Sequence, residues 1–509
     1  MRYPQKADGL ARWVLWLDYR GRVLYWTSDG QTVSGLSGTL VGSVEVADVV
    51  DRIDLDGADI REPMGLNVLW LDGQQPRDLI RVHAVVALVP DSGWADRYVI
   101  TDGQVTRAEL DRPGALIGLE VAPVDATQAA WPPASWTVTD RTWPTAPTQA
   151  SQRYTAYSIP PEWLQSDLPV TTGPDPSSTG RGYPVPYGRH SRTVPAMPVP
   201  IIDRHANQND SDADLILVAG GVPASSSVLV WAVNDDVLTF GSTATPTAEI
   251  DAMGQPASVV DVSSYSNQLR KSKAWFASFD GISSPTPTAG AGHVAGWLLG
   301  SVGAIDLAWS GEAMARSAGL ELAGYIDEPV QPLAWLQDRV AGRLPIATSR
   351  APTGRLRMCW VPWLDCTPVA HLTDGLNGVL RAGPVSEVGQ ATGQRVEVRY
   401  RYHAQQGDYS ATVTLQDGPT AATTATDVLD LDDVVSDATA ATVGAYALWR
   451  NRARQVIRLD ADAAQWSWLQ PGMLVRYSDT ELAISDALHI VLSITRTDRP
   501  FCALELMAT

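Results

Sequence analysis

The sequence is short of cysteine and of long apolar runs. Its three cysteines are too few and too unevenly spaced for a disulfide framework, and Cys359, Cys366 and Cys502 match no zinc or redox motif. We expect free thiols, as in a reducing compartment. No run of about eighteen uncharged apolar residues occurs, and no apolar signal segment follows Met1. We therefore expect a protein made in a cytoplasm, with no transmembrane segment.

Positive charge is also scarce. The chain has 57 acidic and 38 basic residues, which gives a formal net charge of -19, and lysine is rare beside arginine. A protein that grips a phosphate backbone needs clustered lysine and arginine. The composition therefore argues against specific nucleic-acid binding and is typical of a soluble protein.

The motifs of several enzyme classes are missing. There is no Walker loop, no dinucleotide fingerprint, no Gly-x-Ser-x-Gly elbow and no His-Glu-x-x-His motif, and the seven histidines are dispersed. We predict no enzyme activity, no cofactor and no metal, although a metal role for Cys359, Cys366 and His371 stays open. Carboxylates are abundant, but most lie in predicted turns such as Asp72 and Asp102 or in the acidic run 427–437. A glycoside hydrolase needs one of two acids kept protonated in an apolar cleft, and acids in turns and in a solvated charged run do not indicate such a site.

Tryptophan is the residue that the chain uses heavily. The sequence has 19 tryptophans against 4 phenylalanines, and 45% of its residues are hydrophobic. An apolar side chain with an N–H donor suits half-buried sheet faces and subunit interfaces. A chain of 509 residues is long enough for three or four domains. We expect a mainly β protein with a smaller α part, built from several β-barrel or sandwich domains.

The most regular stretch lies near the C-terminus, in the predicted domain 434–509. Acidic residues begin a predicted helix and arginines end it, as the helix dipole favours. Its apolar stripe, at steps of three and four residues, consists of Val435, Ala438, Ala441, Ala445 and Leu448. The pattern then changes to a period of two from Val456 to Leu506, with a loop at 466–472. We expect a small antiparallel sheet or barrel with one buried face.

Residues 1–122 are predicted to form an N-terminal β-domain. Two strands at 13–19 and 23–27 flank Gly21, as in a hairpin. Further strands are predicted at 40–46, 66–71, 78–89, 97–101 and 115–121, with turns at Asp56-Gly57, Asp72-Gly73 and Asp102-Gly103. This pattern predicts a sandwich or barrel of short strands.

Residues 123–200 hold fifteen of the 35 prolines. Proline removes a backbone donor and fixes φ, so we expect neither regular sheet nor helix here. The tryptophans of this segment provide apolar anchors, namely Trp131, Trp136, Trp143 and Trp163. The segment is therefore predicted to be an extended arm pinned to a surface, either of a neighbouring subunit or of this chain.

Two further domains are predicted between the arm and the C-terminal stretch. Residues 201–290 alternate as strands, with turns at Gly220-Gly221 and Asn234-Asp235, and predict a second β-domain. Residues 291–433 predict helices followed by strands. The helices are expected at 293–299, at 311–320, and from Pro332 to Pro345, and the strands at 354–360, 394–403 and 409–416.

Three of these segments, in this order, resemble a known family. They are Gly180-Arg181-Gly182-Tyr183-Pro184-Val185-Pro186-Tyr187-Gly188; the run Gly324-Tyr325-Ile326-Asp327-Glu328-Pro329 with its following helix and strand; and the C-terminal helix, whose Arg-rich turn precedes the loop Leu469-Gln470-Pro471-Gly472-Met473-Leu474-Val475 and a closing hairpin. Together they resemble baseplate hub and tail-tip proteins of tailed bacteriophages. Residues 1–122 also resemble the N-terminal modules by which tail-tip proteins contact the tail tube.

The resemblance implies a structural virion protein, assembled in the bacterial cytoplasm, that closes the distal end of the tail tube and anchors fibres or a spike for host attachment and DNA delivery. Hub proteins commonly form homotrimers whose two barrels per chain make a pseudo-sixfold ring. The barrels here would be 1–122 and 201–285, or one of them with 434–506. The implied partners are the distal tail or tail-tube ring, the tape measure protein and a fibre or spike, with DNA passing through an acidic lumen.

We place the subunit interface at buried aromatic residues. Truncating an aromatic at a well-packed interface centre weakens assembly by roughly 2–4 kcal/mol. The predicted interface residues are Trp449, Trp466, Trp468, Tyr183 and Tyr187. Two other functions stay open: a tail-associated cell-wall hydrolase, and a receptor- or carbohydrate-binding tail protein that uses surface tryptophans.

Overall fold

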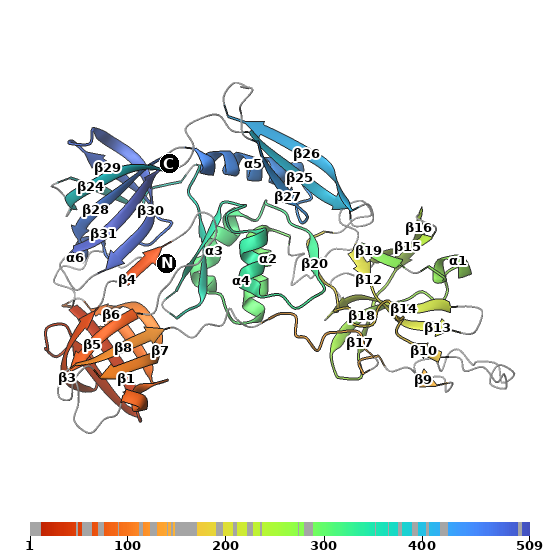
Figure 1. The fold of residues 1–509 in the computed structure, drawn as a ribbon, viewed down its shortest axis with the longest axis horizontal. Coiled ribbons are helices and arrows are strands. Elements are labelled where there is room, and N and C mark those ends of the chain that lie inside the picture. Colours follow the sequence, from red (N-terminus) through yellow and green to blue (C-terminus); the bar gives the residue numbers. More distant parts are fainter. Residues whose placement is uncertain are drawn as a thin grey trace.

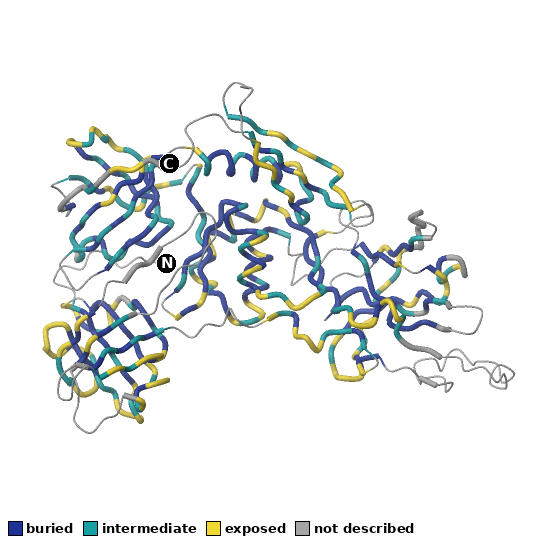
Figure 2. The backbone as a smooth tube through the Cα atoms, viewed as in Figure 1, coloured by how far each residue is buried: buried dark blue, intermediate teal, exposed yellow. Residues whose placement is uncertain are grey.

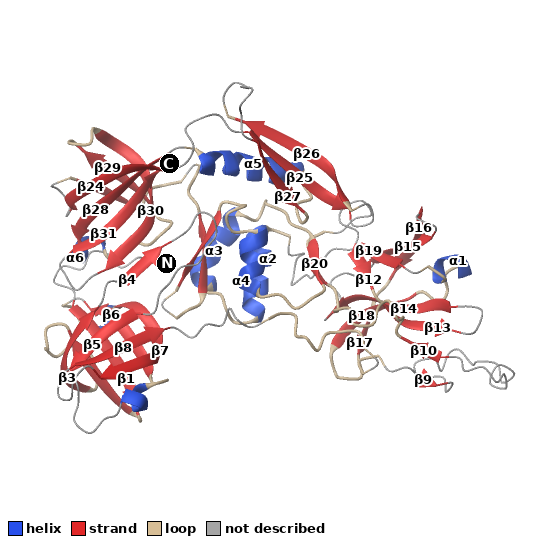
Figure 3. Cartoon of the chain, viewed as in Figure 1, coloured by secondary structure: helices blue, strands red, loops and turns tan. Residues whose placement is uncertain are grey.

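Strands dominate the structure, a computed structural model, and the prediction of a mainly β protein with a smaller α part is confirmed (Figure 3). The N-terminal barrel lies beside the C-terminal sheet, a helical unit lies between them and the second β-domain, and that domain forms the far end of the molecule (Figure 1). The structure describes residues 12–46, 49–52, 64–69, 76–89, 91–110, 116–122, 130–139, 141–143, 146–147, 171–189, 197–206, 211–220, 228–234, 237–272, 274–278, 289–351, 353–364, 366–374, 379–388, 395–403, 407–417, 426–452, 454–496 and 501–509.

The N-terminal strands close into a barrel in the order β1-β2-β3-β5-β8-β7-β6. The strands are β1 Arg12–Tyr19, β2 Arg22–Thr27, β3 Thr39–Val46, β5 Met64–Leu69, β6 His83–Val89, β7 Tyr98–Leu110 and β8 Leu116–Ala122. The predicted hairpin at Gly21 is confirmed, since β1 and β2 pair antiparallel around Arg20 and Gly21, which both have positive φ. Alternate residues such as Leu15, Leu17 and Trp26 fill the barrel.

Two of the predicted barrel features are wrong. Asp102-Gly103 is not a turn, because β7 continues through it, pairing first with β6 and then with β8. The strand predicted at 78–89 begins only at His83, because Pro76–Leu79 forms a 3-10 helix and Arg81 has positive φ. The predicted turns Asp56-Gly57 and Asp72-Gly73 lie outside the described residues.

A short strand connects the barrel to the C-terminal sheet. Strand β4 (Val49–Arg52) follows β3 in the chain but pairs antiparallel with the end of β30 (Ile484–Arg496), with Val50 opposite Thr495. The barrel and the C-terminal sheet therefore lie side by side, joined by main-chain hydrogen bonds (Figure 1).

The proline-rich segment contains short strands, so the prediction that it holds no regular sheet is wrong in part. These are β9 Ala146–Pro147, β10 Thr171–Gly173, β11 Val185–Tyr187 and β12 Met197–Val199. Proline lies in β9, β11 and β12, which have only two or three residues each. Trp131 forms an isolated bridge with Val330, whereas Trp163 lies outside the described residues. The described part of the arm is thus fixed to this chain's own surface.

The second β-domain consists of two sheets around one core. One sheet runs β17 (Thr247–Ile250), β18 (Pro256–Asp261), β14 (Ser211–Gly220), β13 (Ile201–Ala206), β10 and β9. The other runs β12, β19 (Ala274–Ser278), β15 (Val228–Asn234) and β16 (Val237–Ala244), and the short helix α1 spans Asn267–Arg270. Ile216 and Val218 of the first sheet and Val230 and Trp275 of the second belong to the same buried cluster.

The central unit packs three helices against short strands. The helices are α2 Ala291–Ser301, α3 Leu307–Arg316 and α4 Pro332–Arg339, and the strands are β20 Gly324–Ile326, β21 Ile346–Arg350 and β22 Leu356–Trp360. Helix α3 begins four residues before the predicted start because the Asp306 side chain caps it by accepting from the Trp309 amide. Helix α4 begins at Pro332 as predicted but ends at Arg339, well before Pro345.

The long helix α5 (Asp437–Asn451) is confirmed, and Leu448 of its predicted stripe is buried, but the alanines of that stripe are not. Ala438 is exposed, and Ala441 and Ala445 are only half-buried. The buried face centres on Ala440, Val443 and Ala447 of the central core, while Tyr446 and Trp449 enter a second cluster. Helix α5 is covered from two directions, which a single stripe does not describe (Figure 2). On one side it packs on the three-stranded sheet β26 (Asp408–Gln416), β25 (Arg395–His403) and β27 (Thr426–Leu431).

The C-terminal sheet is buried on both faces, not on one as predicted. Its strands are β23 Ala370–Thr373, β29 Leu474–Asp479, β30, β31 Phe501–Ala508, β28 Arg454–Asp462 and β24 Val379–Val388, and a short helix α6 (Ala463–Trp466) precedes the predicted loop. Neighbouring residues belong to different clusters: Ile490 packs with Tyr446 and Trp449, whereas Val491 packs with Leu469 on the opposite face.

Candidate functional site at the arm junction

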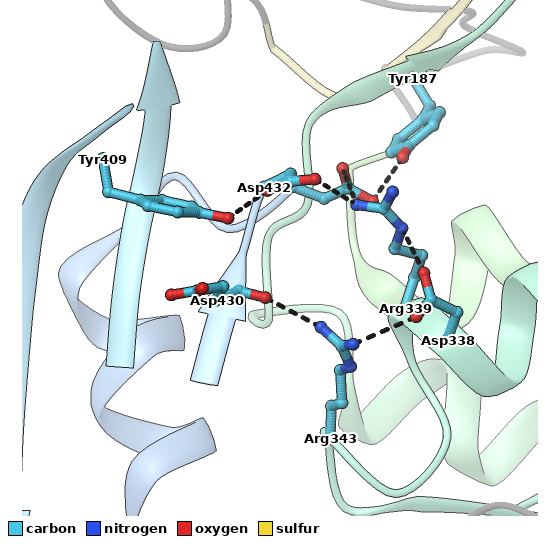
Figure 4. Close-up of polar contacts among 8 residues, drawn as sticks. Tyr187, Asp338, Arg339, Arg343, Tyr409, Asp430 and Asp432 are labelled. Atoms are coloured by element: carbon cyan, nitrogen blue, oxygen red, sulfur yellow. Dashed lines mark hydrogen bonds and ion pairs between the residues drawn. The ribbon is translucent and has the colours of Figure 1, made fainter. Parts of the chain in front are cut away.

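Two distant segments pair where the arm meets the central unit. Strand β11 pairs antiparallel with β20, so Tyr187 lies opposite Gly324. From this position the Tyr187 hydroxyl donates a 2.7 Å hydrogen bond to Oδ2 of Asp433, which precedes α5. We call the polar cluster around this bond the arm junction, and its residues are Tyr187, Asp338, Arg339, Arg343, Tyr409, Asp430, Asp432 and Asp433 (Figure 4).

The backbone at Gly324 allows the arm to approach this closely. A Cβ atom at Gly324 would lie 2.4 Å from the Tyr187 hydroxyl oxygen and 3.0 Å from Oδ1 of Asp433. On the other side, the Tyr187 ring packs edge to face on Trp335 of α4, with a centroid distance of 5.6 Å. The tyrosine is thus held in a slot between a glycine and a tryptophan.

Arg339 is the centre of charge in the arm junction. Its Nη1 lies 3.1 Å from Oδ2 of Asp432 and 3.3 Å from Oδ1 of Asp433, and its Nε lies 2.8 Å from Asp338. Arg343 extends the cluster by donating to the main-chain oxygen of Asp430 at 3.0 Å. The junction therefore ties together the arm, α4, β27 and the segment between β27 and α5 (Figure 4).

Tyr409 of β26 completes the cluster by donating to Oδ1 of Asp432 at 2.5 Å. Burial raises the pKa of Tyr187 well above its usual range, and the Asp433 carboxylate raises it further. Burial and the bond to Asp432 raise the pKa of Tyr409 in the same way. Both hydroxyls therefore stay protonated near neutral pH and act as hydrogen-bond donors.

Asp433 is almost fully enclosed, since its side chain is 12% exposed. Burial raises its pKa, although Arg339 and the Tyr187 hydroxyl act in the opposite direction. One carboxylate oxygen accepts from Tyr187 and the other faces Arg339. With both oxygens occupied, the group is suited to hold segments together and poorly suited to pass a proton to a substrate.

The sequence predicted that Asp432 and Asp433 lie at the start of the helix, where the helix dipole favours acidic residues. That position is wrong. Helix α5 begins later, where the Ser436 side chain caps it by accepting from the Thr439 amide. Asp432 and Asp433 are therefore free to form the junction. Nothing in the local sequence around Arg339 indicated its role in the junction, because Asp432 and Asp433 lie 93 and 94 residues further along the chain.

Tyr183 lies in a second cluster of the arm. Its hydroxyl accepts from Nε1 of Trp143 at 2.9 Å and donates to Oδ2 of Asp251 at 2.5 Å. Asp251 is itself buried and accepts from the main chain of the turn before β18 through its other oxygen. Tyr183 thus fastens the arm to the second β-domain, as Tyr187 fastens it to the central unit.

The three predicted interface tryptophans lie within the C-terminal part of this chain. Trp449 is 7% and Trp466 is 9% exposed, while Trp468 is half-buried beside Trp466. Trp449 also packs under the guanidinium of Arg454, 3.9 Å from the ring centroid. Their place at an interface between subunits stays a prediction. Of the three, Trp468 has the largest exposed fraction and so the most surface that a neighbouring subunit could cover.

The structure separates the residues for which a metal role was left open. Cys359 contacts Ser349, Cys366 faces the main-chain oxygen of Leu364, and His371 contacts Ser478. In the part of the chain that the structure describes, no group of three or more His, Cys, Asp or Glu side chains is arranged to hold a metal ion. Within the same residues, no helix has the length and apolar character needed to span a membrane.

Sequence comparisons give no relatives: no protein-family model matches the chain, and no curated protein does either. Among solved structures, it is similar to the tail protein from Neisseria meningitidis MC58, at 15% identity and a TM-score of 0.30, over 64% of this chain and 96% of that one. It is also similar to a chain of the native gene transfer agent virion, at 15% identity and a TM-score of 0.41, over 65% and 85%.

A third similarity extends over nearly the whole length of both proteins. The 43 kDa tail protein of prophage MuSo2 from Shewanella oneidensis is 8% identical with a TM-score of 0.39, over 98% of this chain and 96% of that one. All three TM-scores are low, and we draw no functional conclusion from them. The similarity to tail proteins is distant.

Proposed function

We propose that this chain is a structural component of a phage tail and, within it, a baseplate hub or tail-tip protein. The observation that carries the proposal is the arm junction. Two of the three segments in which the sequence resembles hub proteins, far apart in the chain, pair with each other as β11 and β20, and Tyr187 also bonds Asp433, just before the third. The proposal therefore rests on two matched segments in direct contact and on their bond to the approach of α5.

The proposed role is mechanical. A hub must hold several β-domains in a fixed relation, and the connections seen in this chain are hydrogen bonds and ion pairs between domains. The arm joins the second β-domain through Tyr183 and the central unit through Tyr187. Strand β4 joins the N-terminal barrel to the C-terminal sheet. The barrel 12–122 and the C-terminal sheet, which lie side by side, are the pair we propose for the two ring-forming domains of each subunit.

The proposed assembly is a homotrimer in the virion tail. Its proposed partners are a distal tail or tail-tube ring, the tape measure protein and a fibre or spike. The solved structures described above are named as tail or virion proteins, and they indicate the class to test without adding weight to the proposal. A cell-wall hydrolase gains no support from the arm junction, since both oxygens of its most buried acid are already bound.

Mass measurement in solution tests the proposal. We expect a species of three times the 54.7 kDa chain mass, or a multiple of it, and no release of soluble fragments from purified peptidoglycan. A monomer that releases such fragments would favour the hydrolase. A monomer that is retained on a glycan array without cleavage would favour the carbohydrate-binding alternative.

A further inference from the structure

Strand β26 is an open sheet edge. It is an end strand of the sheet β26-β25-β27, and β25 is its one neighbour among the described strands. Its nine residues contain no proline, glycine, lysine or arginine, and its single charge, Asp408, lies at the end. Proteins usually protect such edges with charge, proline or bulges. Strand β24, an edge of the C-terminal sheet, shows this protection, with Pro384 and two register shifts.

The opposite edge of the same sheet is contacted by a side chain of the central unit. The main-chain oxygen of Asp430 in β27 accepts a 3.0 Å hydrogen bond from Nη1 of Arg343. A head-to-tail contact through this sheet would need two different open edges, whereas a two-fold contact uses the same edge twice. Pairing β26 with β26 joins two copies without displacing the Arg343 contact on β27.

The sequence of β26 is complementary to itself in that arrangement. The antiparallel register that pairs the whole strand centres on Thr412, which then faces Thr412 of the second copy. Ala411 comes opposite Val413 and Tyr409 opposite Leu415, all on the half-buried face. On the exposed face Ser410 meets Thr414, and at the ends Asp408 meets Gln416. Apolar pairs and hydroxyl pairs stabilise a sheet, and no like charges oppose each other.

Helix α5 provides a second, independent observation. The stripe Ala438, Ala441 and Ala445 was predicted to be buried, but the single chain leaves it exposed or half-buried. Ala441 and Ala445 adjoin Gly444, where a Cβ atom would lie 2.4 Å from Leu415 of β26. The alanines that the single chain leaves uncovered therefore lie on α5 next to the helix face that packs on β26.

The usual distances between paired strands and between packed helices allow a second copy to cover this surface. Paired strands lie about 4.8 Å apart, and α5 contacts both β25 and β26. In the two-fold arrangement both α5 helices lie on the same face of the joined sheet. Packed helices lie about 8–10 Å apart, and small side chains such as alanine allow a close approach.

We propose that two copies of this chain pair through their β26 edges about a two-fold axis at Thr412, with the alanine stripes of the two α5 helices in contact. Tyr409 is the one residue that this contact shares with the arm junction, and Tyr187, Arg339 and Asp433 take no part in it. The β26 contact is therefore a proposal separate from the hub function. It would join two rings of subunits back to back.

Charge pairs at Thr412 test the proposal. Thr412 is exposed, so Thr412→Lys and Thr412→Glu should fold normally, but each places like charges opposite each other at the axis. We expect each variant alone to raise the dissociation constant of the paired species at least about tenfold, measured by mass photometry over a dilution series. An equal mixture of the two variants should restore pairing.

Thr414→Lys is the matched control, because it adds the same charge to the same exposed face opposite Ser410 and not opposite itself. It should weaken pairing less than Thr412→Lys. The proposal is overturned if the wild-type chain shows no even-numbered species, if both Thr412 variants pair like wild type, or if the mixture fails to recover. Loss of the two-fold contact with a ring of subunits retained would leave the hub function standing.

Discussion

The hydroxyl of Tyr187 donates to Asp433, 246 residues further along the chain. This bond joins the arm to the segment that precedes the C-terminal helix α5, across the glycine of β20. Because the tyrosine is buried and the aspartate also faces Arg339, the bond holds three segments in one arrangement. Its removal is the most local test of the arm junction.

Tyr187→Phe should lower the free energy of opening of the β11 and β20 pair by about 1–3 kcal/mol, because it leaves a buried carboxylate without one of its donors. Hydrogen exchange of the amides in 182–187 and 324–330 measures this directly. Tyr402→Phe is the control, since Tyr402 is a half-buried tyrosine of β25 whose ring lies tilted against that of Tyr409, with centroids 5.3 Å apart. Equal exchange in the two variants would show that the Tyr187 hydroxyl does not hold the arm.

Gly324→Ala should destabilise the junction by about 1–3 kcal/mol, because the added methyl would overlap the Tyr187 hydroxyl. The matched control is Gly311→Ala in the middle of α3, where a Cβ atom meets nothing within 4 Å. That change should stabilise the helix by about 0.5–1 kcal/mol. Thermal unfolding compares them, and opposite shifts of the two midpoints are expected.

The protein should lose stability in alkali. Several tyrosine hydroxyls donate to aspartates, and their pKa values are raised: Tyr183, Tyr187, Tyr400, Tyr409 and Tyr477. A group whose folded pKa is raised contributes stability that is complete below its unfolded pKa, about 10 for tyrosine, and is lost as the pH rises through the folded value. The raised pKa of Asp433 has the same sign, but the stability it contributes begins to be lost above the pKa of an unfolded aspartate, about 4, and so is separate from the alkaline loss.

Thermal scans between about pH 8 and pH 11.5, with tyrosinate absorbance followed in parallel, measure this alkaline loss. The midpoint should decline once unfolded tyrosine would ionise, and Tyr409→Phe should flatten the decline. Titration of all tyrosines near pH 10 in a chain that stays folded would contradict the proposed burial of these hydroxyls.

The two neighbouring tryptophans Trp466 and Trp468 should behave differently. Trp466→Ala removes a buried side chain and should cost about 3–5 kcal/mol of folding stability. Trp468→Ala should cost less, since Trp468 is half-buried. If Trp468 is an interface residue, its truncation should instead weaken assembly by roughly 2–4 kcal/mol. Denaturation and mass photometry of both variants separate the two effects, and intact assembly of Trp468→Ala would remove it from the interface.

Local signals in the sequence were enough to predict the class of fold and several elements. The glycine at 21 marks the first hairpin, and Pro332 marks the start of α4, because both residues act through their own backbone. The change of period after α5 also predicted strands correctly. Failures came where a residue's environment depends on distant segments, as in the C-terminal sheet that is buried on both faces.

The arm junction illustrates the same limit. Tyr187 was singled out from the Gly-Pro-rich segment, but its partners Arg339 and Asp433 were not. A carboxylate three residues before a helix cap looks the same in sequence whether it favours a dipole or binds an arginine. The pairing of β11 with β20 places Tyr187 beside Asp433, and α4 brings Arg339 to the same carboxylate.

The rotational symmetry of the purified assembly tests the central claim most directly. Electron microscopy of the isolated chain should show a three-fold ring, with two β-domains of each subunit in a pseudo-sixfold arrangement. A particle that is a single chain at all concentrations, and that degrades a cell-wall substrate, would contradict the account.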